Sequence, residues 1–102
     1  MEYSYVWEKF FGAMMSLVGE LPLRARLEYA AQSIIALKHQ TIPEDVKDDV
    51  MSLIEDLTSG NPDGEEGKIH ATIKRMSDEE ARDTAKRILG YYDKIARHRR
   101  PH

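Results

Sequence analysis

Cysteine is absent from this chain of 102 residues. The absence excludes disulfide bonds, thiol catalysis and cysteine-based zinc sites, and it is compatible with a reducing compartment. Long apolar runs are missing too, since no stretch approaches the roughly 20 residues that a membrane-spanning helix needs. The first residues, Met1, Glu2 and Tyr3, include no basic group, so the start of the chain does not look like a signal peptide. We therefore expect a cytoplasmic protein without a membrane partner.

Strand-like alternation of polar and apolar residues is also absent, and the chain contains no internal repeat. Apolar residues instead recur at helical spacing, in a composition that is 41% apolar and 32% charged. Such a composition is typical of globular helical proteins, and the length is that of one domain. The sequence predicts an all-α fold over residues 1–102, a compact bundle of four main helices plus one short helix, with a basic, frayed tail at about 97–102.

Local signals place the helices along the chain. The main helices are expected at about residues 4–18, 23–38, 43–59 and 78–98, and the short helix at about 68–75. Two helix starts have the spacing of a capping box, Thr41 with Glu44 and Ser77 with Glu80. In the last helix, the residues predicted to face inward are Ala81, Ala85, Ile88, Leu89, Tyr92, Ile95 and Ala96.

The first helix carries more apolar surface than one core contact requires. Its apolar side chains cover an arc of roughly 160°, whereas a surface helix usually shows a stripe nearer 100°. Two interpretations stay open. Either the helix is central and covered on both sides by its own chain, or the excess forms an interface with a second copy or another protein. Under the second interpretation, the candidate interface residues are Trp7, Phe11, Met14, Met15 and Val18.

The net charge of −3 conceals an uneven distribution. Residues 44–66 are strongly acidic, whereas the end of the chain is basic, which allows either head-to-tail association or simple solvation. The basic end offers an alternative function, nucleic-acid binding, through Lys94, Arg97, Arg99 and Arg100. The pI of 5.8 counts against a dedicated nucleic-acid domain. Several basic residues of the last helix also have an acid four residues before them, which predicts ion pairs on a solvated helix face rather than a nucleic-acid surface. The pairs are Asp78–Arg82, Asp83–Arg87 and Asp93–Arg97.

Catalytic and metal-binding motifs are not found. The histidines form no HExxH arrangement, and the chain contains no G-x-S-x-G nucleophile elbow. The loop at residues 61–66 carries carboxylates, but it places Glu66 where an EF-hand needs glycine. The acidic side chains are expected on exposed faces with ordinary pKa values, which does not suit general acid catalysis. The sequence therefore predicts a protein that is not an enzyme and holds no metal and no cofactor.

A family resemblance is carried by the segments 7–10 (WEKF), 23–27 (LRARL), 67–72 (GKIHAT) and 76–81 (MSDEEA). Together they look like a group of short, uncharacterised bacterial helical proteins. The segments span most of the length, and each is a helix or cap signature. The resemblance implies a free-standing bacterial protein and carries no activity.

The function that fits these observations is a non-catalytic protein–protein interaction or oligomerisation module. Its expected partner is a second copy, giving a homodimer, or another protein. A nucleic-acid-associated regulator that uses the basic C-terminal helix and tail is the alternative.

Overall fold

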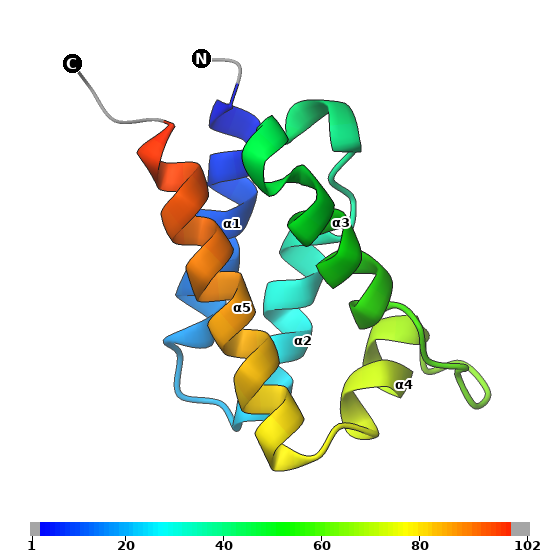
Figure 1. Ribbon diagram of the computed structural model, residues 1–102. Coiled ribbons are helices and arrows are strands. Elements are labelled where there is room, and N and C mark those ends of the chain that lie inside the picture. Colours follow the sequence, from blue (N-terminus) through cyan, green and yellow to red (C-terminus); the bar gives the residue numbers. More distant parts are fainter. Residues whose placement is uncertain (1–2, 99–102) are drawn as a thin grey trace.

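Helices account for most of residues 3–98, the part of the chain that the computed structural model describes (Figure 1). In chain order they are α1 (Ser4–Leu17), α2 (Leu23–Ile34), the 3-10 turn η1 (His39–Thr41), α3 (Glu44–Leu57), α4 (Lys68–Lys74) and α5 (Asp78–Arg97). No strand occurs within these residues, so the predicted all-α class is confirmed. The same part of the chain contains no helix that is long and apolar enough to cross a membrane.

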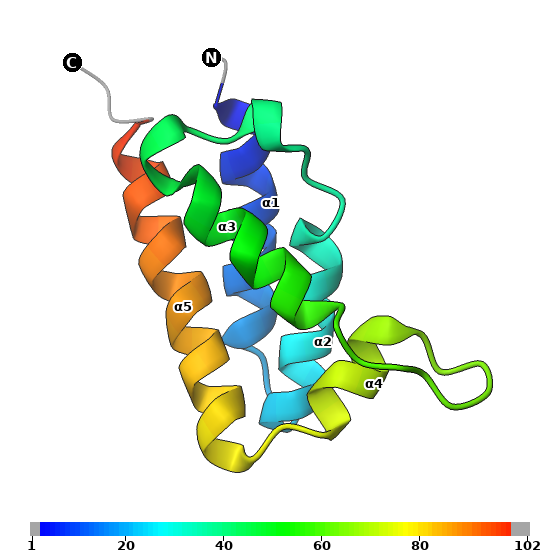
Figure 2. The same ribbon diagram turned by 45° about the vertical axis from the view of Figure 1, so that its right-hand side comes forward.

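α1 lies between two other helices, with α2 on one side and α5 on the other (Figures 1 and 2). Both neighbours run antiparallel to α1, so the start of α1 and the end of α5 lie at the same end of the molecule. α3 lies across these helices, and the short α4 packs against α2 and α3. α1 therefore has neighbours from its own chain on both flanks.

The core forms where one face of each long helix meets the others. In α1 and in α3 the buried positions follow the same spacing of i, i+4, i+7 and i+11, which keeps them on one side of a helix. Each fully buried large side chain stabilises the fold by about 1.5–3 kcal/mol relative to an exposed one. The largest members are Phe10, Leu27, Ile34, Leu53, Leu57, Ile73, Ile88 and Ile95.

The two predicted capping boxes have different outcomes. At the start of α5, the Ser77 hydroxyl accepts from the Glu80 backbone N–H at 3.0 Å, and the Ser77 N–H donates to the Glu80 carboxylate at 2.8 Å, so this capping box is confirmed. The box at Thr41 is wrong. The Thr41 hydroxyl donates to the Lys38 carbonyl at 2.7 Å within the 3-10 turn, and α3 begins after Pro43 without a side-chain cap. α2 also ends at Ile34, earlier than expected.

A close backbone contact fixes the connection between α3 and α4. The Gly60 N–H donates to the Thr72 hydroxyl at 2.8 Å, and this hydroxyl donates in turn to the Lys68 carbonyl at 2.7 Å. A Cβ atom at Gly60 would lie 2.7 Å from the Thr72 backbone nitrogen. Only glycine therefore fits here without displacing α4.

Candidate interaction surface

α1 presents two different faces. Its buried face, which includes Phe10 and Ala13, belongs to the core. On the outward side, Phe11 is 41% exposed, Met15 is 55% exposed and Val18 is 69% exposed. These residues follow one another at spacings of four and three, so they line up along one side of the helix. The core thus uses only part of the apolar surface of α1.

The remaining candidate interface residues, Trp7 and Met14, lie between these two faces. Both are partly buried and pack against the core. The Trp7 ring stacks on that of Phe11, with ring centroids 5.0 Å apart and planes 11° apart, and its centroid lies 6.4 Å from that of Tyr92 in α5. The structure therefore separates the candidates. Trp7 and Met14 pack at the edge of the core, whereas Phe11, Met15 and Val18 face outward.

α5 adds a leucine beside the exposed side of α1. Leu89 is 52% exposed, so the prediction that it faces inward is wrong. The buried row of α5 runs through Ala81, Ile88 and Ile95, and Leu89 lies a step of 100° away from Ile88 around the helix. α1 and α5 are antiparallel, and Trp7 of α1 lies beside Tyr92 of α5. One turn further along α1 is Phe11 and one turn back along α5 is Leu89, so these two residues lie at the same level.

These exposed apolar residues form a surface that we name the outer strip, and its members are Phe11, Met15, Val18, Leu21 and Leu89. Each of the five exposes at least two fifths of its surface, and exposed apolar residues that gather on one side of a protein often mark an interaction site. Leu21 and Leu89 were missed by the sequence analysis. Leu21 lies in a turn next to Pro22, where no helical spacing reveals which way a side chain faces.

The connection that carries Leu21 is fixed by Arg26. The guanidinium of this residue donates to the Leu17 carbonyl at 2.6 Å and to the Leu21 carbonyl at 2.7 Å. The first of these carbonyls belongs to the last turn of α1, where carbonyl groups lack helical partners. The backbone at Leu21 is therefore held next to the end of α1.

The basic residues proposed for nucleic-acid binding face acids of the same chain. Lys94 lies 3.9 Å from Asp49 of α3, and Arg97 lies 2.7 Å from Asp93 in α5, which confirms that predicted intrahelical pair. Arg99 and Arg100 lie outside the described residues, as does most of the predicted tail. The charged groups that the structure describes at this end are thus engaged within the chain.

Lys94 belongs to a series of contacts between acidic and basic side chains that we name the α3–α5 ladder. Its pairs are Asp45–His98, Asp49–Lys94 and Asp56–Arg87. The residue numbers of each pair add to the same total, because every step along α3 is matched by an equal step back along α5. Arg87 bonds Asp56 at 2.9 Å, rather than the Asp83 predicted from spacing. Asp78 likewise pairs with Arg24 at 2.8 Å, rather than with Arg82.

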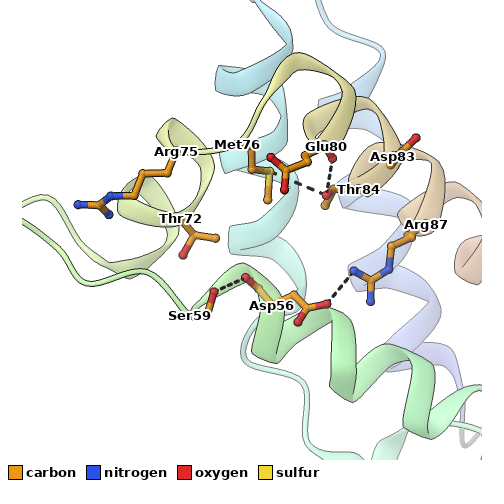
Figure 3. Close-up of a pocket in the computed structure, with 9 residues that line it drawn as sticks. All are labelled: Asp56, Ser59, Thr72, Arg75, Met76, Glu80, Asp83, Thr84 and Arg87. Carbon is orange, nitrogen blue, oxygen red and sulfur yellow. Dashed lines mark hydrogen bonds and ion pairs between the residues drawn. The ribbon is translucent and has the colours of Figure 1, made fainter.

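A polar hollow of about 420 Å³ lies between the end of α3, α4 and the start of α5 (Figure 3). Its groups mostly bond one another or nearby backbone. Arg87 binds Asp56, the Thr84 hydroxyl donates to the Glu80 carbonyl at 2.8 Å, and the Glu80 carboxylate accepts from Ser77. The hydrogen bond from the Ser77 N–H holds the pKa of Glu80 below its ordinary value, so this acid is a poor proton donor. The lining residues are Asp56, Ser59, Thr72, Arg75, Met76, Glu80, Asp83, Thr84 and Arg87.

A second polar cluster joins α2, α4 and the loop before α4. His70 Nδ1 lies 2.9 Å from the Glu28 carboxylate, and His70 Nε2 lies 3.8 Å from that of Glu66. Lys74 donates to Glu66 at 2.6 Å, and this bond is the main reason why the pKa of Glu66 is lowered. Within residues 3–98 no group of three or more histidine or acidic residues is arranged to hold a metal ion. The expectation that all acids keep ordinary pKa values is wrong for Glu66, Asp78 and Glu80, because a hydrogen bond lowers the pKa of each: from Lys74 to Glu66, from Arg24 to Asp78 and from the Ser77 N–H to Glu80.

No family model, no curated protein and no solved structure matches the chain. The resemblance to short bacterial helical proteins therefore stays a prediction.

Proposed function

We propose that this protein is a non-catalytic oligomerisation module that forms a symmetric homodimer through the outer strip. The observation that supports the proposal is the outward position of Phe11, Met15 and Val18, on a helix whose other side already belongs to the core. Aromatic residues and methionine are enriched at protein interfaces. Covering them removes apolar surface from water, which is the main favourable term in association.

A second copy of the chain can cover the outer strip. A standard interface buries about 800 Å² on each partner, and the outer strip would be its apolar centre, with neighbouring polar residues at the rim. In a two-fold dimer the same surface faces itself, so every apolar contact occurs twice. The outer strip runs along α1, and Leu89 of the neighbouring helix α5 lies beside it. Two copies can therefore pack with one layer of helices against the other.

The experiment is to measure molecular mass by sedimentation equilibrium over a concentration series. We expect the unmodified protein to pass from monomer to dimer as its concentration rises. The double variant Phe11→Gln, Met15→Gln should stay monomeric, because it places amides where the dimer needs apolar contact. Both residues face outward, so this variant should keep its helical circular dichroism.

Tyr29→Gln is the matched control. Tyr29 is 56% exposed on α2, and it lines a hollow with Glu28 and His70, next to α4 rather than along the outer strip. This variant should dimerise like the unmodified protein. A protein that is monomeric at every concentration, or a double variant that dimerises as well as the control, would show that the outer strip is not the interface.

Nucleic-acid binding ranks second because Lys94 and Arg97 already have acidic partners. If it occurred, its affinity would fall steeply with added salt, and it would be lost when Lys94, Arg97, Arg99 and Arg100 are replaced by glutamine, which leaves the buried Ile95 in place.

A further inference from the structure

Sulfur chemistry in this chain is confined to methionine, because the sequence contains five methionines and no cysteine. Among the methionines that the structure describes, Met15 is the exposed one, and Met14, Met51 and Met76 pack partly buried against the core. The Met76 sulfur also lies 3.9 Å from the Thr84 hydroxyl oxygen. Of these four methionines, Met15 is therefore the one whose thioether is most open to an oxidant in solution.

Met15 also occupies the middle of the outer strip. Phe11 precedes it by one helical turn and Val18 follows it by one, and all three face outward. A change of polarity at this position alters the apolar centre of the proposed interface. The core is unaffected, because its members in α1 lie on the other side of the helix.

We propose that Met15 is a reversible oxidation site that controls dimerisation, an inference that rests on the proposed homodimer. The oxidant is a peroxide such as hydrogen peroxide. The thioether sulfur attacks one peroxide oxygen, an S–O bond forms, the O–O bond breaks, and water leaves with the second oxygen. The sulfur loses two electrons and the peroxide gains them. The return step reduces the sulfoxide with two electrons from a dithiol in a methionine sulfoxide reductase, so that the dithiol becomes a disulfide, the oxygen leaves as water and the thioether is restored.

The sulfoxide opposes dimerisation because it is polar. In the monomer its oxygen stays in water, whereas in the dimer it is buried without a hydrogen-bond partner. One such group weakens binding about tenfold, and a symmetric dimer contains Met15 twice, so we expect the dissociation constant to rise roughly a hundredfold. The dimer also shields Met15, so oxidation proceeds through free protomers and slows as the protein concentration rises.

The test compares the unmodified protein with Met15→Leu, which keeps the apolar volume and removes the sulfur. Both are treated with dilute hydrogen peroxide, the oxidised residues are identified by peptide mass spectrometry, and the dissociation constant is measured by sedimentation. We expect the unmodified protein to dissociate and to recover after treatment with a reductase. Met15→Leu should remain dimeric throughout.

Two results would overturn the oxidation inference without contradicting the proposed homodimer. The first is a protein that carries sulfoxide at Met15 and dimerises as before. The second is Met15→Leu dissociating to the same extent, which would assign the effect to another residue. A different result would contradict the proposed homodimer itself. In that case the protein is monomeric before treatment and Met15 oxidises at a rate independent of protein concentration, so the oxidation inference fails as well.

Discussion

Glu66 shows how one side chain can join separate segments. Its carboxylate accepts from the Lys74 ammonium group at 2.6 Å and from the Asp63 backbone N–H at 2.6 Å. These bonds are stronger with the ionised carboxylate than with the neutral acid, so they lower its pKa from the ordinary value of 4.5. The folded state therefore prefers the ionised form more strongly than the unfolded chain does.

This preference makes the contribution of Glu66 depend on pH. A carboxyl group whose pKa is lowered by folding stabilises the protein fully above its unfolded pKa, and the contribution is lost as the pH falls toward the lowered value. We predict that Glu66→Gln is less stable than the unmodified protein at neutral pH and that the difference shrinks below about pH 4.5. Urea unfolding at a series of pH values measures it. Glu65→Gln, at the exposed neighbouring position, is the control, and a Glu66→Gln deficit that stays constant down to pH 3 would contradict the prediction.

Two glycines with different surroundings give a prediction at the scale of the helices. Gly60→Ala places a Cβ atom 2.7 Å from the Thr72 backbone nitrogen, whereas at Gly90, inside α5, a Cβ atom meets nothing within 4 Å. We expect Gly60→Ala to destabilise the protein by about 1–3 kcal/mol through overpacking. Gly90→Ala should stabilise it by about 0.5–1 kcal/mol, since alanine favours a helix interior. Urea unfolding of both variants measures the two changes in the free energy of unfolding, which should have opposite signs. A stabilising Gly60→Ala would mean that α4 can shift away from Gly60 at no cost.

Helix boundaries were predictable where one local interaction decides them. Ser77 and Glu80 lie three residues apart and cap α5 without help from the rest of the molecule. Thr41 and Glu44 have the same spacing, yet Thr41 bonds the Lys38 carbonyl, because the chain forms a 3-10 turn there before it enters α3. Spacing alone does not distinguish these two cases.

The outer strip was only partly predictable for a similar reason. Helical periodicity placed Phe11, Met15 and Val18 beyond the core stripe, but it assigned Leu89 to the inside. Whether a residue at the edge of a stripe is covered depends on where the neighbouring helix passes, and that position is a property of the whole fold. The ion pairs of Asp78 and Arg87 follow the same rule, because their partners Arg24 and Asp56 are distant in sequence.

At the scale of the whole molecule, the α3–α5 ladder explains the uneven charge distribution. Three acids of the acidic stretch face basic side chains of α5 or its C-terminal end within one chain, so part of the acidic charge lies beside basic groups before any second molecule approaches. Each pair is partly exposed and contributes little by itself, about 0–1 kcal/mol. The head-to-tail association suggested by the charge asymmetry therefore loses part of its electrostatic basis.

The two faces of α1 give a prediction about heat unfolding. If the outer side of α1 is covered by a second copy, dimerisation stabilises the folded state, and the melting temperature rises with protein concentration. We expect the Phe11→Gln, Met15→Gln variant to melt at a temperature that does not depend on concentration. Differential scanning calorimetry over a concentration series measures both. If the melting temperatures of the two proteins rose equally with concentration, dimerisation would not involve the outer strip.

The position of α1 also relates the amount of the protein to its persistence. Because the same helix supports the core and the proposed dimer, a diluted protein loses partners and, with them, part of its resistance to unfolding. Proteases act on the unfolded fraction, so turnover should quicken when synthesis falls and slow when it rises. A helix that is apolar on two sides would in this way make the lifetime of each molecule a function of how many copies surround it.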